Sequence, residues 1–254
     1  MEKRIIYPIS AFIIVFVIWE LIVRFSIIKS VFLPPPTTVI LAIFKNFGYW
    51  LISILITLKH IGIGYVIGTV LAILIGLAIG WYKTIDRSIA PLLLIISPIP
   101  IVTFLPLFII WFGLGEFPII LCAIIAAFFP SLFNTSSGVK KVDKSLIEVA
   151  KNFGINDRDL LKKVILPGAL PHIANGLRLS IQLTFLVTPV AEMIMGDVGL
   201  GGFIWKSADL FKTDRVILGQ FTLGFIGLLI FKVFDFIEKK YLLPWMRIGD
   251  KNES

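Results

Sequence analysis

Apolar residues occur along this chain in long blocks that short polar and basic segments separate. A membrane-crossing helix needs roughly 20 mostly apolar residues, and six blocks approach this length. The period-2 alternation typical of barrel strands does not occur. Because backbone polar groups in lipid must be satisfied internally, we expect helices. The pattern predicts an all-α membrane protein with six transmembrane helices, at Ile5–Phe25, Ile61–Trp81, Pro91–Trp111, Phe117–Phe133, Leu177–Met195 and Val216–Ile237.

Basic residues fall mainly between these blocks and predict the orientation. With the N-terminus inside, the cytoplasmic segments carry sixteen Lys and Arg residues and the opposite segments carry seven. Because positive residues concentrate on the cytoplasmic side, we expect both termini there, in a multi-pass protein of the cell membrane. The first block follows basic residues as a secretory signal does, but it is longer and no cleavage site follows it. It is therefore interpreted as a retained span.

Composition disfavours several other classes. The chain is 57% hydrophobic and 16% charged, whereas a soluble domain has about 25% charged residues. The net charge of +8 does not form one stripe, so nucleic-acid binding is not expected. With Cys122 the single cysteine and two histidines, His60 and His172, no metal site is expected. The sequence also has no phosphate-binding G-x-x-x-x-G-K-[ST] motif and no clustered catalytic set, so we expect no cofactor and no enzyme activity.

Small residues recur at every fourth position of the second block and so share one helix face. They are Gly64, Gly68, Ala72, Gly76 and Gly80. Such a face lets another helix approach closely. The partner helix belongs either to the same chain or to a second copy, and simple tolerance of glycine in membrane helices is the alternative.

Proline interrupts the third block. Pro98, Pro100 and Pro106 each remove a backbone donor, so we expect a kinked helix. Such a helix either lines a transport pathway or is a purely structural kink.

The segment between the fourth and fifth blocks predicts two short helices. Ser145 and Glu148 form a capping box that starts the first helix, and Gly154 ends it. Asn156 caps the second helix, and Pro167 stops it near Leu166. Apolar residues share one face of each helix amid charged neighbours: Leu146, Ala150 and Phe153 on the first, Leu160 and Val164 on the second. These faces suit docking onto a partner.

This segment resembles the EAA loop of ABC importer permeases. The likeness rests on Glu148-Val149-Ala150, then Gly154, then Ile165-Leu166-Pro167, although Val149 stands where the generic motif has Ala. It extends over roughly Leu51 to Trp245 and is similar to the nitrate/sulfonate/taurine-type subgroup. Further matching segments are WFGLGE (Trp111–Glu116), FFPSLFNT (Phe128–Thr135), LPGALPHIANGLRLSI (Leu166–Ile181), AEM (Ala191–Met193) and GLGGFI (Gly199–Ile204).

The resemblance implies a type I (MetI-like) permease fold. It implies an N-terminal helix and external loop at 1–50, a permease domain at 51–245 with a coupling loop at about 140–172, and a cytoplasmic tail at 246–254. The implied partners are an ABC ATPase subunit, an extracytoplasmic solute-binding protein, a second permease copy in a homodimer, and membrane lipid. The residues that this likeness assigns to ATPase coupling are Glu148, Ala150, Gly154, Leu160 and Pro167.

Members of this subgroup carry sulfonates, nitrate, taurine-like or pyrimidine-like solutes. The alternative function is an ATP-independent secondary carrier. Such carriers usually show repeated architecture and ionisable groups within their spans, whereas this chain shows no repeat and few such charges.

Polar residues in the third and fifth blocks are candidates for the solute pathway. They are Ser97, Thr103, Gln182, Thr188 and Glu192. A carboxylate within a span is costly unless it is paired or wet. Glu192 is therefore expected either to face a water-filled cavity or to bond the backbone disrupted at Pro189. The glycine-rich Gly199–Ile204 is expected to form an external or re-entrant turn.

Overall fold

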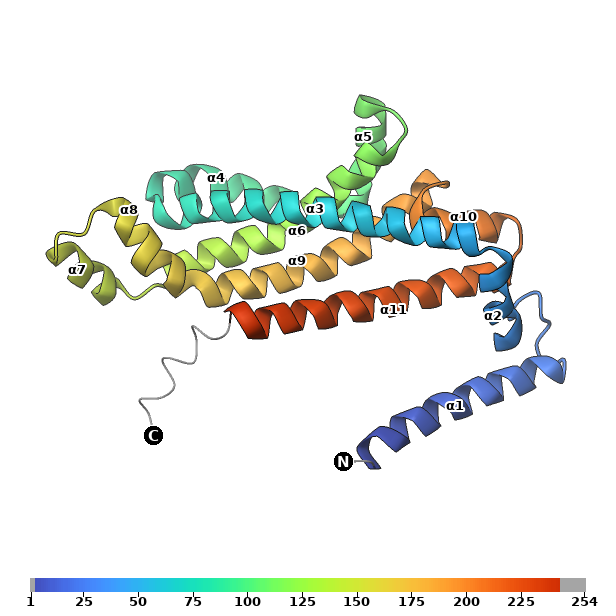
Figure 1. Cartoon of the computed structure of the whole chain (residues 1–254). Helices are drawn as coiled ribbons and strands as arrows, with labels where there is room; N and C mark the ends of the chain where they lie inside the picture. The colour runs from blue at the N-terminus through green and yellow to red at the C-terminus, as the bar shows by residue number, and fades with distance from the viewer. Residues whose placement is uncertain (1–2, 243–254) are drawn as a thin grey trace. The chain divides into compact units, whose positions relative to one another are not determined.

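The computed structural model describes residues 3–242, and every regular element in that range is helical (Figure 1). The predicted tail at 246–254 lies outside the described residues. The helices are α1 (Lys3–Arg24), α2 (Pro36–Lys45), α3 (Phe47–Trp81), α4 (Lys83–Ile96), α5 (Leu105–Phe112), α6 (Glu116–Lys140), α7 (Lys144–Asn152), α8 (Asp157–Leu160), α9 (Leu166–Met195), α10 (Gly199–Asp209) and α11 (Thr213–Ile237).

Among residues 3–242, four helical segments are long and apolar enough to cross a membrane: Phe47–Trp81, Glu116–Lys140, Asp157–Met195 and Thr213–Lys240. The pair α4 and α5 would add a fifth if it forms one broken span. These segments cover the second to sixth predicted blocks. Helix α1 covers nearly all of the first predicted block but is not among these segments. The total of six spans therefore remains a prediction.

The third predicted span is not a single kinked helix. Helices α4 and α5 lie at 90° to each other, with a 3₁₀ turn at Ile101–Phe104 between them. Pro98 and Pro100 cause the break, because neither can donate a backbone hydrogen bond and each disfavours helical geometry at the residue before it. The expectation of a kinked helix over Pro91–Trp111 is therefore wrong in its geometry, because the helix is broken there; that the pair forms one span stays a prediction.

The chain divides into two compact units. One unit contains the chain up to Thr57 together with Glu192–Ile226, and the other contains Leu58–Ala191 and the chain from Gly227 onward. The boundaries fall inside α3, α9 and α11.

In the larger unit, α6 lies between α3 and α9 (Figure 1). Four glycines on the small-residue face of α3 lie very close to α6. A β-carbon on any of them would meet an α6 atom within 3.0 Å; they are Gly64, Gly68, Gly76 and Gly80. Ala72 on the same face is completely buried. The small-residue face is therefore a packing surface within one chain.

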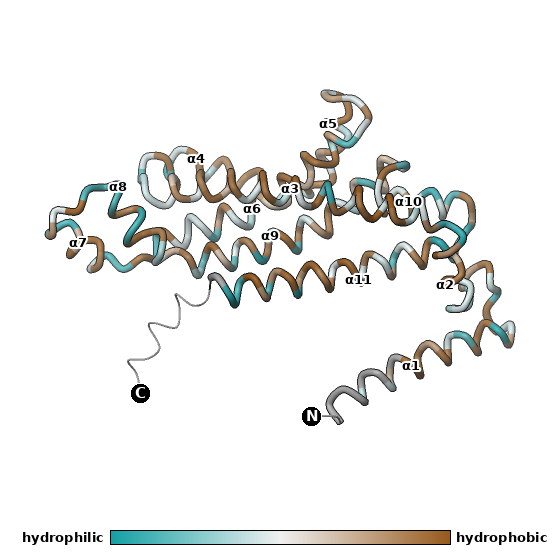
Figure 2. The backbone as a smooth tube through the Cα atoms, viewed as in Figure 1, coloured by the Kyte–Doolittle hydropathy of each residue, from teal (hydrophilic) through white to brown (hydrophobic). Residues whose placement is uncertain are grey.

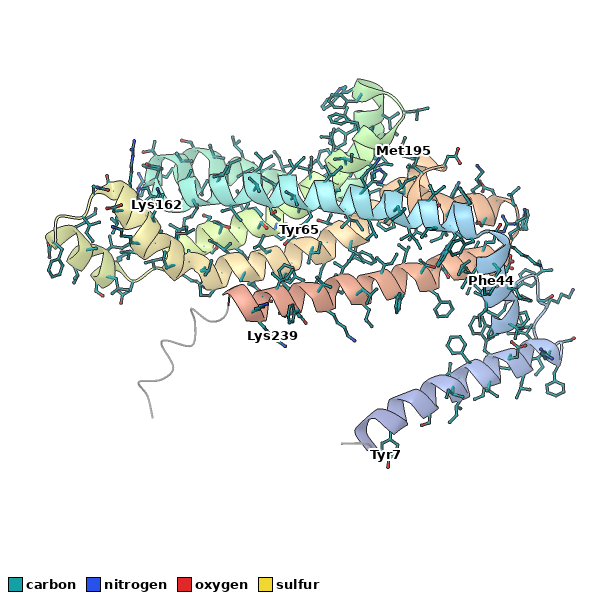
Figure 3. The ribbon with its side chains drawn as sticks, viewed as in Figure 1. Tyr7, Phe44, Tyr65, Lys162, Met195 and Lys239 are labelled. Atoms are coloured by element: carbon teal, nitrogen blue, oxygen red, sulfur yellow. The ribbon has the colours of Figure 1, made fainter. Side chains whose placement is uncertain are left out.

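Hydrogen bonds join α6 to α9, on the side of α6 that faces away from α3. The Ser180 hydroxyl donates to the Ala127 carbonyl at 2.6 Å and lies 2.7 Å from the Ser131 hydroxyl. Along α3, the Tyr65 hydroxyl donates to the Leu177 carbonyl at 3.3 Å (Figure 3). Hydroxyl groups thus satisfy one another and the backbone inside the bundle, as membrane interiors require.

The segment between α6 and α9 is more helical than predicted. Its first helix begins at Lys144, because the Asp143 carboxyl accepts from the Ser145 N–H at 2.9 Å. The capping role assigned to Ser145 is therefore wrong. Gly154 ends this stretch with φ +75°, and Asn156 caps α8 by accepting from the Asp159 N–H at 2.9 Å; both were predicted.

Pro167 does not end the second helix. Helix α8 runs through a π-helical turn at Leu161–Ile165 directly into α9. The wider turn accommodates a proline that lacks an N–H and would otherwise crowd the carbonyl of Lys163. Figure 2 shows α7 and α8 as the polar end of this unit, beside the apolar lengths of α3, α6 and α9.

The smaller unit has its own core. Phe203 and Ile204 of α10 pack with Val39 and Ala42 of α2 and with Leu218 of α11. The predicted turn at Gly199–Ile204 is instead the start of α10. Residues 1–50 were expected to form a transmembrane helix and an external loop. The part after α1 also contains a helix, α2.

Candidate functional site

A buried hydrogen-bond network surrounds Glu192 in the smaller unit. The Glu192 side chain is completely buried. Its Oε2 accepts from the Thr57 hydroxyl at 2.7 Å and from the Gly201 backbone N–H at 3.0 Å. The Thr57 oxygen in turn accepts from the Leu200 backbone N–H at 2.8 Å. One carboxyl group and one hydroxyl group thus join the end of α9, the N-terminal part of α3 and the start of α10.

The first turn of α10 explains this arrangement. The first N–H groups of any helix lack partners within that helix, and the N-cap residue Val198 has no side chain that can accept from them. Glu192 and Thr57 supply the missing acceptors. A carboxylate is also favoured by the partial positive charge at a helix N-terminus.

Gly199 provides the space that Glu192 occupies. Its φ of +67° is a backbone conformation that favours glycine. A β-carbon at this position would lie within 3.0 Å of the Glu192 carboxyl atoms. Gly199 thus permits the close approach of Glu192 to α10.

The prediction for Glu192 was therefore partly correct. Glu192 does bond to backbone, at the Gly201 N–H of α10; the expected bond to the backbone near Pro189 stays a prediction. Thr57, which precedes the predicted second span, was not among the predicted site residues. A polar residue in an apolar stretch was the signal that would have identified it.

The other four pathway candidates have separate local environments. Thr188 is completely buried and donates to the Thr184 carbonyl at 2.8 Å. The Ser97 and Thr103 hydroxyls donate to carbonyls of their own segment, those of Leu94 and Pro100. Gln182 is exposed on α9. The structure does not join these four residues into one site.

A second candidate site is the exposed apolar surface of α7 and the turn after it. We call this the α7 surface, and it consists of Leu146, Val149 and Phe153, whose exposed fractions are 57%, 52% and 83%. The Glu148 side chain is also exposed. Large apolar residues gathered on a surface outside the spans are typical of interaction sites.

Two residues expected at this surface face inward instead. Leu160 is completely buried and Ala150 is 7% exposed, and both pack in one core cluster with Ile165 and Ala169. The prediction that the Leu160 face offers a docking contact is therefore wrong. A short helix must bury one face to be stable, and here that face packs in a cluster that the π-helical turn at Leu161–Ile165 and the start of α9 share.

The residues at the two ends of α7 have distinct local environments. The hydrogen bond from the Ser145 N–H lowers the pKa of the Asp143 carboxyl below its ordinary value. Gly154 has no heavy atom within 4 Å of the position of an added β-carbon. Its requirement for glycine therefore comes from its positive φ alone.

Comparison with known proteins adds independent information. Residues 68–247 match the family described as "Binding-protein-dependent transport system inner membrane component". The chain is 34% identical to a protein of Methanocaldococcus jannaschii that is provisionally named an ABC transporter permease protein, over 97% of this chain and 94% of that protein. It is 33% identical to a Bacillus subtilis protein provisionally named an aliphatic sulfonates transport permease, over 91% and 84%. It is 28% identical to the taurine transport system permease protein of Escherichia coli, over 96% and 91%.

Proposed function

The chain belongs to the family of binding-protein-dependent transport system inner membrane components, and on this premise we propose that it forms the solute pathway of an ATP-binding-cassette importer. It is a multi-pass protein of the cell membrane and a transport subunit. In this proposal a separate ATPase supplies the energy and an extracytoplasmic binding protein delivers the solute. Two copies of the chain surround the pathway within the lipid bilayer.

The solute is proposed to be small and of the kind that the relatives' names give. Those names include aliphatic sulfonates, taurine, nitrate and formylaminopyrimidine. Because Gln182 is an exposed polar residue on the apolar helix α9, it is the pathway candidate that we favour. Ser97, Thr103 and Thr188 are weaker candidates because their hydroxyls already bond to backbone.

The observation that carries the coupling proposal is the exposure of the α7 surface. Phe153 is 83% exposed at the polar end of the larger unit, where water and not lipid surrounds the protein under the predicted orientation. Burial of a large aromatic side chain by a partner would remove an unfavourable contact with water. We assign the ATPase to this surface.

The buried face of α7 suggests how motion is transmitted. Ala150 and Leu160 pack with Ala169 and Ile173 of α9 in one cluster. Close-packed interiors transmit displacement because they are nearly incompressible. A movement that the ATPase imposes on α7 would therefore shift α9, which carries Gln182. In this proposal Glu148 and Gly154 position the contact, and Leu160 and Pro167 connect it to α9.

The test separates contact with the partner from folding. Phe153→Asp should reduce co-purification of the ATPase and abolish ATP-driven uptake while the melting temperature stays like wild type. Leu160→Ala is the matched comparison, since loss of a buried Leu costs about 2–5 kcal/mol. It should lower the melting temperature. Normal ATPase retention by Phe153→Asp would refute the coupling surface, and solute uptake that continues without ATP would favour the secondary carrier.

A further inference from the structure

Three helix ends lie together in the larger unit, where they line one pocket. Trp81 is the last residue of α3, Lys83 is the first residue of α4 and Lys140 is the last residue of α6. Two of these helices are apolar enough to span a membrane. Under the predicted topology, the change from apolar to basic residues here corresponds to the membrane–water boundary, where Trp and Lys are both favoured.

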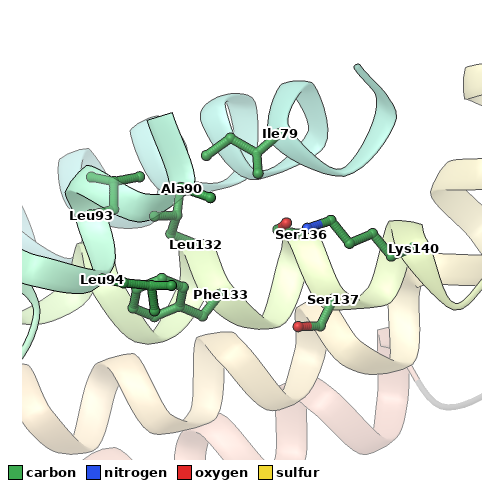
Figure 4. Close-up of a pocket in the computed structure, with 9 residues that line it drawn as sticks. All are labelled: Ile79, Ala90, Leu93, Leu94, Leu132, Phe133, Ser136, Ser137 and Lys140. Atoms are coloured by element: carbon green, nitrogen blue, oxygen red, sulfur yellow. The ribbon is translucent and has the colours of Figure 1, made fainter. Parts of the chain in front are cut away.

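An apolar pocket of about 130 Å³ lies directly below this boundary. Figure 4 shows Leu93, Leu94 and Phe133 gathered toward one end of it, and Ser136 and Lys140 at the other. The pocket therefore has an apolar end and a polar, basic end.

A second pocket of about 350 Å³ adjoins the first, because Ile79 and Lys140 line both. Three lysines and one carboxylate line it: Lys83, Lys140, Lys144 and Asp86. The Lys140 ammonium pairs with the Asp86 carboxylate at 2.6 Å. Lys83 and Lys144 add two positive charges that this carboxylate does not balance.

We propose that these two adjoining pockets form a binding site for an anionic phospholipid. Lys83 and Lys144 hold the headgroup phosphate in the larger pocket, and the adjoining apolar pocket takes up hydrocarbon of the same lipid molecule. Basic pockets between membrane helices on the cytoplasmic side are suited to anionic headgroups. The predicted orientation places both pockets on that side.

Charge and apolarity together select this occupant. Inorganic phosphate would satisfy the lysines but leave the apolar pocket empty, and a neutral lipid would fill the pocket but leave the two lysines unbalanced. A phosphate-headed anionic lipid satisfies both parts.

The experiment measures lipid binding to the full chain purified in detergent. Phosphatidylglycerol and phosphatidylcholine are titrated separately, and bound lipids are counted by native mass spectrometry. Wild type should bind phosphatidylglycerol more tightly. Each removed lysine should weaken binding about fivefold, equivalent to about 1 kcal/mol, so Lys83→Gln with Lys144→Gln should remove most of the preference.

Lys141→Gln is the matched control. Lys141 is exposed beside Lys140 but lines neither pocket. It should leave the preference unchanged, whereas Ala90→Leu, which fills the apolar pocket, should weaken binding of phosphatidylglycerol. Inorganic phosphate in excess should not displace the lipid.

Three results would overturn the proposal. One is equal binding of the two lipids to wild type, and another is an equal effect of Lys141→Gln and the double variant. The third is release of the lipid on addition of the ATPase subunit or on dimer formation, which would assign this surface to a protein partner. Melting temperatures of all variants, measured in parallel, confirm that binding is compared among folded proteins.

Discussion

The carboxyl group of Glu192 and the hydroxyl group of Thr57 form a hydrogen bond of 2.7 Å between residues 135 positions apart in the sequence. Both side chains are completely buried. Because Thr57 also accepts from Leu200 and Glu192 accepts from Gly201, the pair fixes the first turn of α10. This relationship favours a structural role for Glu192.

We therefore expect Glu192→Leu to lower stability. It would leave the Thr57 hydroxyl and the Gly201 N–H without their acceptor, and each buried unsatisfied group costs about 1–3 kcal/mol. Glu192→Gln keeps one acceptor oxygen and should have a smaller effect. Thermal unfolding and uptake are measured together, with Asp197→Asn as the control because that carboxylate is 71% exposed. Unchanged stability with altered uptake would instead assign Glu192 to the pathway.

The close packing of α3 against α6 leads to a second prediction. Gly76→Ile should lower the melting temperature, since a β-carbon would meet Thr135 and Leu132 of α6 within about 3.0 Å, and overpacking typically costs about 1–3 kcal/mol or more. Gly62→Ile is the matched control in the same helix, because nothing lies within 4 Å of its added β-carbon. Equal melting temperatures of the two variants would show that the small-residue face is not required.

The turn after α7 allows a test of backbone conformation alone. Gly154→Val should strain the turn by about 1–2 kcal/mol, because a β-branched residue disfavours the positive φ found there. We expect weaker retention of the ATPase with normal membrane insertion. Gly154→Asn is the control, since Asn tolerates this conformation better. If the Val variant retains the ATPase as well as the Asn variant does, the geometry of this turn is unimportant for coupling.

The predicted orientation is tested by thiol labelling. Single cysteines replace Lys83, Lys162 and Lys206 in a Cys122→Ser background; Cys122 itself is buried. A membrane-impermeant reagent should label position 206 in intact cells and should label positions 83 and 162 only after the membrane is opened. External labelling of position 162 would reverse the proposed topology.

Sequence alone predicted the features that depend on local chemistry. Long apolar blocks identified the helices of the membrane-spanning part, because length and hydropathy decide whether a helix can cross lipid. The positive φ at Gly154, the cap at Asn156 and the disruption of the proline-rich block also followed from single residues or short motifs. The family resemblance came from short motifs in the same way.

Tertiary structure decided the features that depend on distant residues. Leu160 looked like an exposed contact by its helical spacing, yet it is buried, because only the fold places Ile165 and Ala169 beside it. The partner of Glu192 was likewise beyond prediction, since Thr57 lies 135 residues away. Pro167 did not end its helix, because a π-helical turn accommodates it. Periodicity shows which residues share a face, but the packed structure determines what that face meets.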